Sequence, residues 1–87
     1  DLTKYKILLV VIISHYKNKN YNIEKIIDNL SKDISSRAHQ INCITDATAK
    51  GYLHKIISNS DKRKKFLKPS EDLIAQFEIY LKKFYNK

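Results

Sequence analysis

A dense cluster of cationic side chains lies in the C-terminal half of this 87-residue sequence. Its members are Lys62, Arg63, Lys64, Lys65 and Lys68. A surface turn can be kept soluble by charge of either sign, whereas contact with phosphate requires cations. The whole chain shares this bias, because 17 Lys and Arg residues oppose 9 Asp and Glu residues and leave a formal net charge of +8. The cluster therefore predicts a polyanionic partner, first a nucleic acid and second an anionic membrane surface.

A second group of polar side chains falls on one face of a helix predicted over residues 35–50. If Ile41 and Ile44 form its buried side, together with residue 47 or 48, the rotation of about 100° per residue turns the opposite side chains outward. The outward residues are then Ser35, Ala38, His39, Asn42 and Asp46. Asn42 could pair with adenine, and His39 could donate a hydrogen bond to a base or a phosphate.

The two groups together define the candidate contacts to a duplex. An ordinary solvated helix face is the alternative interpretation of the second group, and the cationic cluster immediately downstream favours binding. The candidate DNA contacts are Ser35, Ser36, Arg37, His39, Gln40, Asn42, Lys62, Arg63, Lys64 and Lys65.

Residues that could hold a metal or catalyse a reaction are sparse. His39 and Cys43 stand four positions apart, a spacing that can chelate zinc on a helix, but only His15 and His54 remain to complete such a site. No Ser/His/Asp or Cys/His arrangement has a suitable spacing, and a single Gly excludes a phosphate-cradling Gly-rich loop. We therefore predict neither an enzyme nor a bound metal or other cofactor, and a partly buried Cys43 rather than a redox sensor.

Length and composition predict one domain that spans residues 1–87. A chain this short buries roughly 60–65% of the surface that its unfolded form exposes, which leaves little room for a deep substrate cavity. One Gly and one Pro disfavour a sandwich of strands and favour helices joined by short connections. The single Cys excludes an internal disulfide, and the longest apolar run, residues 7–13, is far shorter than the roughly 20 residues that cross a bilayer. We therefore expect a cytoplasmic protein.

Capping and periodicity signals predict the helices of the N-terminal half. Residues 3–16 fit a buried helix with Thr3 as its N-cap, although the β-branched residues 10–13 would also fit a strand. Asn22 can cap a second helix from Ile23 to about Ser31. The apolar stripe of that helix comprises Ile23, Ile26, Ile27 and Leu30. A short connection over residues 32–34 leads to the third helix, which Ser35 or Ser36 can cap.

The pattern changes to strands after Gly51, which suits the left-handed residue that closes a helix. Residues 52–58 are typical of a strand and residues 59–62 of a turn, and residues 64–68 return as a second strand that Pro69 stops. Ser70 can cap a final helix with one continuous apolar face. That face comprises Leu73, Ile74, Phe77, Tyr80, Leu81 and Phe84. We expect most Tyr and Phe side chains to belong to the core.

These elements predict a mainly α fold with a small β-hairpin wing, in the α+β class. The predicted architecture is a winged helix-turn-helix, with a three-helix core plus a long C-terminal helix. Its helix-turn-helix covers about residues 22–50, its wing about residues 52–68 and its final helix about residues 70–86.

Residues spaced through the third helix, the hairpin and the final helix match a known pattern. They are Gly51, Tyr52, Leu53, Ser58, Asp61, Arg63 and Ser70. In these residues the segment 36–70 resembles the winged helix-turn-helix of MarR-like transcriptional regulators. The resemblance implies that Arg63 is a wing-tip arginine in or beside the minor groove, and that Asp61 braces this arginine or the wing turn. After the wing the sequence departs from the Leu-Thr-x-x-Gly of the family and reads Pro-Ser-Glu-Asp-Leu.

The sequence as a whole therefore predicts a DNA-binding transcriptional regulator. Residues 35–50 would read the major groove, and residues 59–68 would contact the backbone or the minor groove. The expected partners are double-stranded DNA and a second copy of the chain, joined through the N- and C-terminal helices, with no membrane. The alternative is a winged-helix module for protein or RNA contacts without sequence-specific readout of DNA. Membrane binding through the first helix is disfavoured, because interfacial helices need a strongly polar face.

Overall fold

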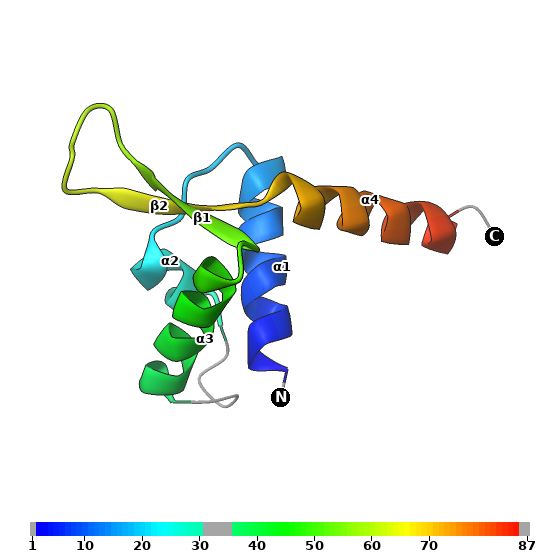
Figure 1. Cartoon of the computed structure of the whole chain (residues 1–87), viewed down its shortest axis with the longest axis horizontal. Helices are drawn as coiled ribbons and strands as arrows, with labels where there is room; N and C mark the ends of the chain where they lie inside the picture. The colour runs from blue at the N-terminus through cyan, green and yellow to red at the C-terminus, as the bar shows by residue number, and fades with distance from the viewer. Residues whose placement is uncertain (1, 31–35, 86–87) are drawn as a thin grey trace.

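The computed structural model describes residues 2–30 and 36–85. In these ranges the chain forms four helices and one two-stranded antiparallel sheet. The elements are α1 (Thr3–Tyr16), α2 (Ile23–Asp28), α3 (Arg37–Ala49), β1 (Leu53–Ile57), β2 (Lys65–Pro69) and α4 (Glu71–Tyr85). Figure 1 shows α3 and the hairpin on one side of α1, whereas α4 extends from the other side. The predicted mainly helical α+β composition is confirmed, and none of the described helices combines the length and apolarity needed to cross a bilayer.

Helix α1 has the predicted bounds, but the predicted N-cap is wrong. Leu2 is the N-cap residue and supplies no side-chain hydrogen bond, while Thr3 is buried in the first turn. At the other end Asn18 adopts a left-handed conformation with φ of 55°. The Asn18 and Lys19 amides donate to the carbonyls of His15 and Ser14 at 3.1 and 2.9 Å, the paired bonds of a Schellman motif.

Helix α2 begins where Asn22 predicts it. The Asn22 side chain accepts a hydrogen bond from the Lys25 amide at 2.8 Å. The helix ends at Asp28, earlier than predicted, and residues 31–34 lie outside the described part of the chain. Its apolar stripe is confirmed, because Ile26 and Leu30 are buried and the other two members pack partly against the core.

Helix α3 carries the expected signals at both ends. The Ser36 side chain accepts a hydrogen bond from the His39 amide at 3.2 Å, so Ser36 is the N-cap, and Ser35 lies outside the described residues. At the C-terminal end Gly51 has φ of +83°, as predicted for a left-handed cap. The Gly51 and Tyr52 amides donate to Thr48 and Ala47 carbonyls at 3.1 and 3.0 Å, which turns the chain directly into β1.

The hairpin pairs β1 with β2 in one continuous antiparallel register, from Leu53 opposite Pro69 to Ile57 opposite Lys65. Pro69 is the last residue of β2 and so belongs to the strand that it was predicted to stop. On the far side of β2, Tyr21 forms an isolated bridge with Leu67, and its carbonyl accepts from the Leu67 amide at 2.9 Å. The connection between α1 and α2 therefore contributes a third short extended segment beside the hairpin.

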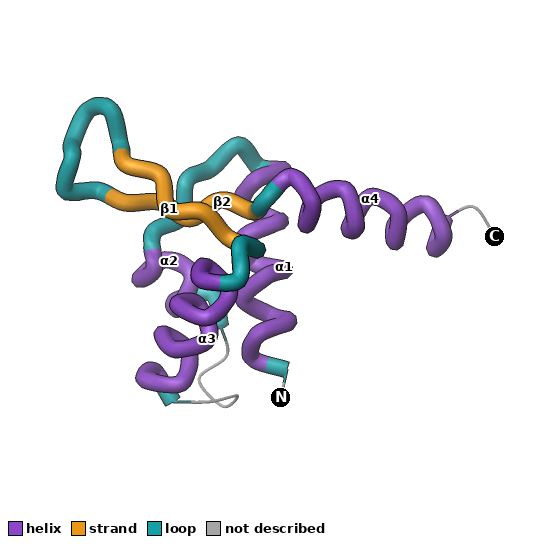
Figure 2. The backbone as a smooth tube through the Cα atoms, in the orientation of Figure 1, coloured by secondary structure: helices purple, strands orange, loops and turns teal. Residues whose placement is uncertain are grey.

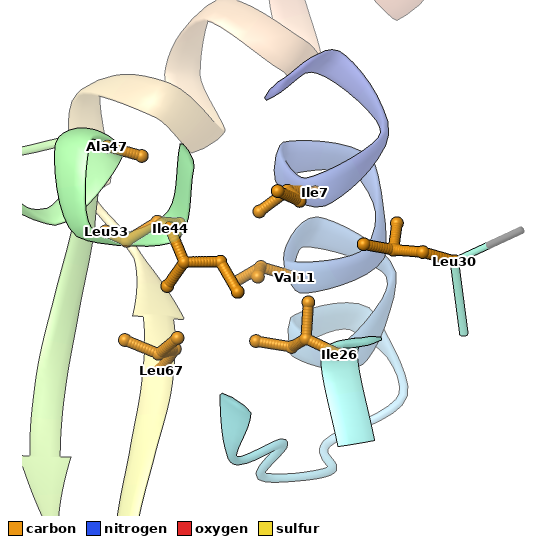
Figure 3. Packing of buried hydrophobic residues seen from close by; sticks show 8 residues of the cluster. All are labelled: Ile7, Val11, Ile26, Leu30, Ile44, Ala47, Leu53 and Leu67. Atoms are coloured by element: carbon orange, nitrogen blue, oxygen red, sulfur yellow. The ribbon is translucent and has the colours of Figure 1, made fainter. Parts of the chain in front are cut away.

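One core joins three helices to the base of the hairpin. Its buried members are Ile7, Val11, Ile26, Leu30, Ile44, Ala47, Leu53 and Leu67. Figure 3 shows Val11 of α1 and Ile44 of α3 pointing toward each other, with Ile26 and Leu67 beside them. At roughly 1.5–3 kcal/mol for each large aliphatic side chain buried, this cluster is the main source of stability for the domain. The predicted three-helix core is confirmed.

Helix α4 lies largely outside this core. Ser70 caps it by accepting from the Leu73 amide at 3.1 Å, as predicted, but no described residue of the helix is buried. Leu73 packs against the core, and farther along the Tyr16 hydroxyl donates to the Glu78 carboxylate at 3.2 Å. The expectation that most aromatic side chains are core residues is wrong. Five of them are at least half exposed, namely Tyr5, Tyr16, Tyr80, Phe84 and Tyr85.

Candidate nucleic-acid interface

The tip of the hairpin is held in shape by Asp61. Its carboxylate accepts a hydrogen bond from the Arg63 amide at 3.0 Å, and its backbone carbonyl accepts from the Lys64 amide at the same distance. The Lys64 carbonyl in turn accepts from the Ser58 amide at 3.0 Å, which closes the loop. Among the described residues Asp61 forms no ion pair with the neighbouring cations, and its carboxylate is engaged with the backbone of the turn. Of the two bracing roles predicted for this residue, the structure supports bracing of the turn.

The cationic side chains of the tip are solvent exposed. Lys62, Arg63, Lys64 and Lys65 all lie on the surface. None of the four forms an ion pair within residues 2–30 and 36–85. Four adjacent unneutralised cations repel one another, and that repulsion is relieved when a polyanion binds.

Positive charge continues from the tip along both strands. The register places Lys65 opposite Ile57 and Lys68 opposite His54, and all four side chains are exposed. Lys55 is also exposed and adds a cation that the sequence reasoning did not select. Strand alternation did not predict its exposure, because Lys55 lies opposite the buried Leu67 and therefore on the same face of the hairpin. The hairpin thus carries cations from its tip to its base.

The exposed face of α3 is close to the predicted one. Ala38, His39, Asn42 and Asp46 are exposed, as expected from the helical rotation. Thr45 is exposed on the same face and was missed. These side chains offer an amide, an imidazole and a hydroxyl to a partner, which is the mixture that reads base edges in a groove.

Gln40 does not belong to this exposed face. Its side chain is only 4% exposed, and it forms the buried side of α3 together with Ile44 and Ala47. Ile41, which was predicted to be buried, is only partly so. The helix is therefore turned by less than one residue position from the predicted orientation. A buried Gln40 cannot contact DNA directly, so this candidate contact is corrected.

Arg37 is placed at the start of α3, but it already has a partner. Its guanidinium donates a hydrogen bond to the Glu24 carboxylate of α2. That hydrogen bond, and then the charge of Arg37, hold the pKa of Glu24 below its ordinary value. Both side chains are more than half exposed, so a phosphate could compete with Glu24 for the guanidinium.

The carboxylate on the exposed face of α3 is neutralised. Asp46 Oδ2 lies 3.1 Å from Lys50 Nζ and 3.7 Å from Lys4 Nζ. The hydrogen bond to Asp46 raises the pKa of Lys50. Two cations beside one carboxylate remove most of the repulsion that Asp46 would exert on a phosphate backbone.

His39 and Cys43 approach each other without completing a metal site. The Cys43 Sγ lies 3.6 Å from the His39 Nε2, and the thiol is partly buried as predicted. In the described residues no group of three or more His, Cys, Asp or Glu side chains could hold a metal ion.

Figure 2 shows how these parts are distributed over the molecule. The hairpin loop and α3 both lie on the side of the domain away from α4, with the base of the hairpin joined to the C-terminal end of α3. Compared with family models, curated proteins and solved structures, the chain matches none of them. What the site can do is therefore argued from its geometry and charge.

Proposed function

We propose that this chain is a DNA-binding domain of a transcriptional regulator. Helix α3 would enter the major groove with Asn42, His39 and Thr45, while the hairpin contacts the sugar-phosphate backbone or the minor groove. The observation that carries the proposal is the hairpin tip, where Asp61 fixes the turn and four exposed cations have no acidic partner among the described residues. A polyanion is the partner that such a surface fits.

The order of the elements supports a winged helix-turn-helix architecture. Helices α2 and α3 precede the hairpin, and the Tyr21 bridge adds an extended segment on the outer side of β2. The resemblance to MarR-like regulators is part of the proposal. Three residues that carry it have clear local roles, because Gly51 closes α3, Asp61 fixes the turn and Ser70 caps α4.

The exposed apolar surface supports a homodimer as the binding species. Exposed apolar side chains recur at helical spacing on α1 and its N-cap, on the side away from the core. They are Leu2, Tyr5, Leu9, Ile13 and Tyr16. Between α1 and α4 lies a hollow of about 660 Å³ whose lining is mostly apolar. A second copy that covers this surface would present two α3 helices to sites about 34 Å apart on one duplex. The proposal places the protein in the compartment that holds the DNA, in line with the cytoplasmic location expected from the sequence.

The salt dependence of duplex binding tests the proposal. The double variant Lys62→Ala with Lys64→Ala removes two tip cations and should lower affinity for every duplex sequence. The log–log slope with salt should shrink by about 0.9 for each lost phosphate contact, and so by up to about 1.8. The matched variant Lys82→Ala with Lys83→Ala removes the same charge from the far end of α4 and should leave the slope unchanged.

Three outcomes would contradict the proposal. The first is no detectable binding of mixed-sequence duplexes at low salt. The second is an equal loss in both double variants, which would indicate attraction by net charge alone. The third is displacement of DNA by an RNA duplex or an acidic protein at equal salt, which would favour a module for RNA or protein contacts. Asn42→Ala should change sequence preference rather than overall affinity.

A further inference from the structure

We propose that a polar pocket at the C-terminal end of α1 binds a phosphate dianion. The pocket lies where the connection after α1 meets the end of β2, close to the point at which α4 begins. It is lined by Ser14, His15, Asn18, Lys19, Asn20, Lys68 and Pro69. In Figure 1 these segments meet at the end of α1 opposite the N-terminus.

The lining combines cations with neutral donors. Lys19 and Lys68 reach the pocket from two different segments, and neither forms an ion pair with a described residue. His15 adds an imidazole, and Asn18 and Asn20 add side-chain amides, each of which can donate hydrogen bonds. Such a set of donors is complementary to phosphate oxygens.

Carboxylates that would repel an anion are absent from the described lining, and the carbonyls of Ser14 and His15 at the end of α1 are already hydrogen-bonded. No carboxylate lines the pocket among the residues that the structure describes, and the nearby Glu71 and Asp72 are not among its lining residues. The end of a helix carries partial negative charge on its free carbonyls. Here the carbonyls of Ser14 and His15 accept backbone hydrogen bonds in the Schellman motif, so this negative charge is reduced at the pocket.

The size of the pocket limits the ligand. Its volume is about 250 Å³, below the range of about 300–1,000 Å³ that is usual for drug-sized ligands. A single phosphate group fits this size and charge, either as inorganic phosphate or as the terminal group of a small monoester. The residues of the hairpin tip and of α3 do not line the pocket, and of the cationic cluster of the hairpin only Lys68, at its base, does so among the described residues.

Binding there would add a link between two segments that the Tyr21 bridge already joins. Lys19 belongs to the connection between α1 and α2, and Lys68 lies just before the junction that directs α4. A phosphate that contacts both would fix the start of α4 relative to α1.

Titration of the full chain by NMR tests the pocket. Inorganic phosphate, added against chloride at constant ionic strength, should shift the backbone amides of residues 14–20 and 68–70 with a Kd on the order of 1 mM or tighter. The double variant Lys19→Ala with Lys68→Ala should weaken binding on the order of tenfold, about 1.4 kcal/mol. The variant Lys82→Ala with Lys83→Ala removes equal charge from the far end of α4 and should bind phosphate as the wild type does.

Titrations with different phosphate compounds distinguish a free phosphate ion from a phosphate monoester as the ligand. Glycerol phosphate that shifts the same amides at lower concentration would indicate a monoester ligand, whereas a preference for inorganic phosphate would indicate the free ion. Dimethyl phosphate, a monoanion that mimics the DNA backbone, should bind more weakly. The proposal would be overturned if dimethyl phosphate binds equally well, if the shifts spread over all Lys-bearing segments, or if both double variants lose the same affinity.

Discussion

Gly51 connects α3 to the hairpin, and replacing it with Ala isolates the energetic cost of a left-handed backbone. The residue has φ of +83°, a conformation that costs an L-residue roughly 1–2 kcal/mol. Beyond its chain neighbours, an added Cβ would meet no atom within 4 Å, so overlap with the rest of the protein contributes nothing to the effect. The prediction for Gly51→Ala therefore depends on backbone conformation alone.

Two opposing terms decide the sign of this effect. Ala restricts the unfolded chain more than Gly does, which stabilises the folded state by about 0.4–1 kcal/mol at positions where the backbone is compatible. At Gly51 the left-handed strain outweighs this gain. The expected net loss is about 1 kcal/mol, which corresponds to a fall in Tm of about 4–8 °C for a domain of this size.

Thermal unfolding followed by far-ultraviolet circular dichroism measures this difference directly. Gly51→Asn is the matched control, because Asn adopts the left-handed region more readily than Ala and should lose less stability. An Ala variant as stable as the wild type, or an Asn variant less stable than the Ala variant, would refute the reasoning about the α3 cap.

Two further predictions concern α3. In the Glu24–Arg37 pair the folded state lowers the pKa of Glu24, so the pair stabilises the protein above the ordinary carboxyl value of about 4.3 and this contribution is lost as pH falls through the lowered pKa. Glu24→Gln should reduce the loss of unfolding free energy at acidic pH, measured by urea unfolding at several pH values. By releasing Arg37, it should also raise affinity for duplex DNA at neutral pH. An unchanged dependence of stability on acidic pH would contradict the role of the pair. Ile44→Ala should lower the free energy of unfolding by about 2–5 kcal/mol in urea unfolding, because Ile44 is 1% exposed in the core. Ile41→Ala, at a partly buried position, should lower it clearly less.

Signals that act over three or four residues predicted the fold well. Asn22, Ser36 and Ser70 cap the helices that follow them, and Gly51 closes α3, because each needs only its own side chain or backbone freedom and a nearby amide. The hairpin register follows from alternation and from a short polar turn. The same local reasoning selected the cations of the hairpin tip, whose exposure the structure bears out.

Features set by packing between elements were predicted less well. Gln40 is a polar residue on the buried side of α3, and no local rule distinguishes it from its exposed neighbours. The partner of Arg37 lies 13 positions away on another helix, so the sequence pattern could select the arginine but not its engagement with Glu24. Phosphate contact by Arg37 must therefore compete with an existing ion pair.

The apolar face of α4 shows why periodicity identifies a buried surface without identifying what covers it. The face was correctly placed along the helix, yet Tyr80 and Phe84 are 64% and 61% exposed. The direction of the helix is set at its N-cap, where the Ser70 amide donates to the Tyr52 carbonyl at 2.9 Å and extends the hairpin pairing. Beyond Leu73 that direction carries α4 away from the core; Phe77 still packs against Tyr16 of α1, whereas Tyr80 and Phe84 stay exposed. Apolar side chains gathered on one helix face, rather than scattered over the surface, are typical of an interface. In the proposed dimer, a second copy of the chain would cover both this stripe and the exposed face of α1.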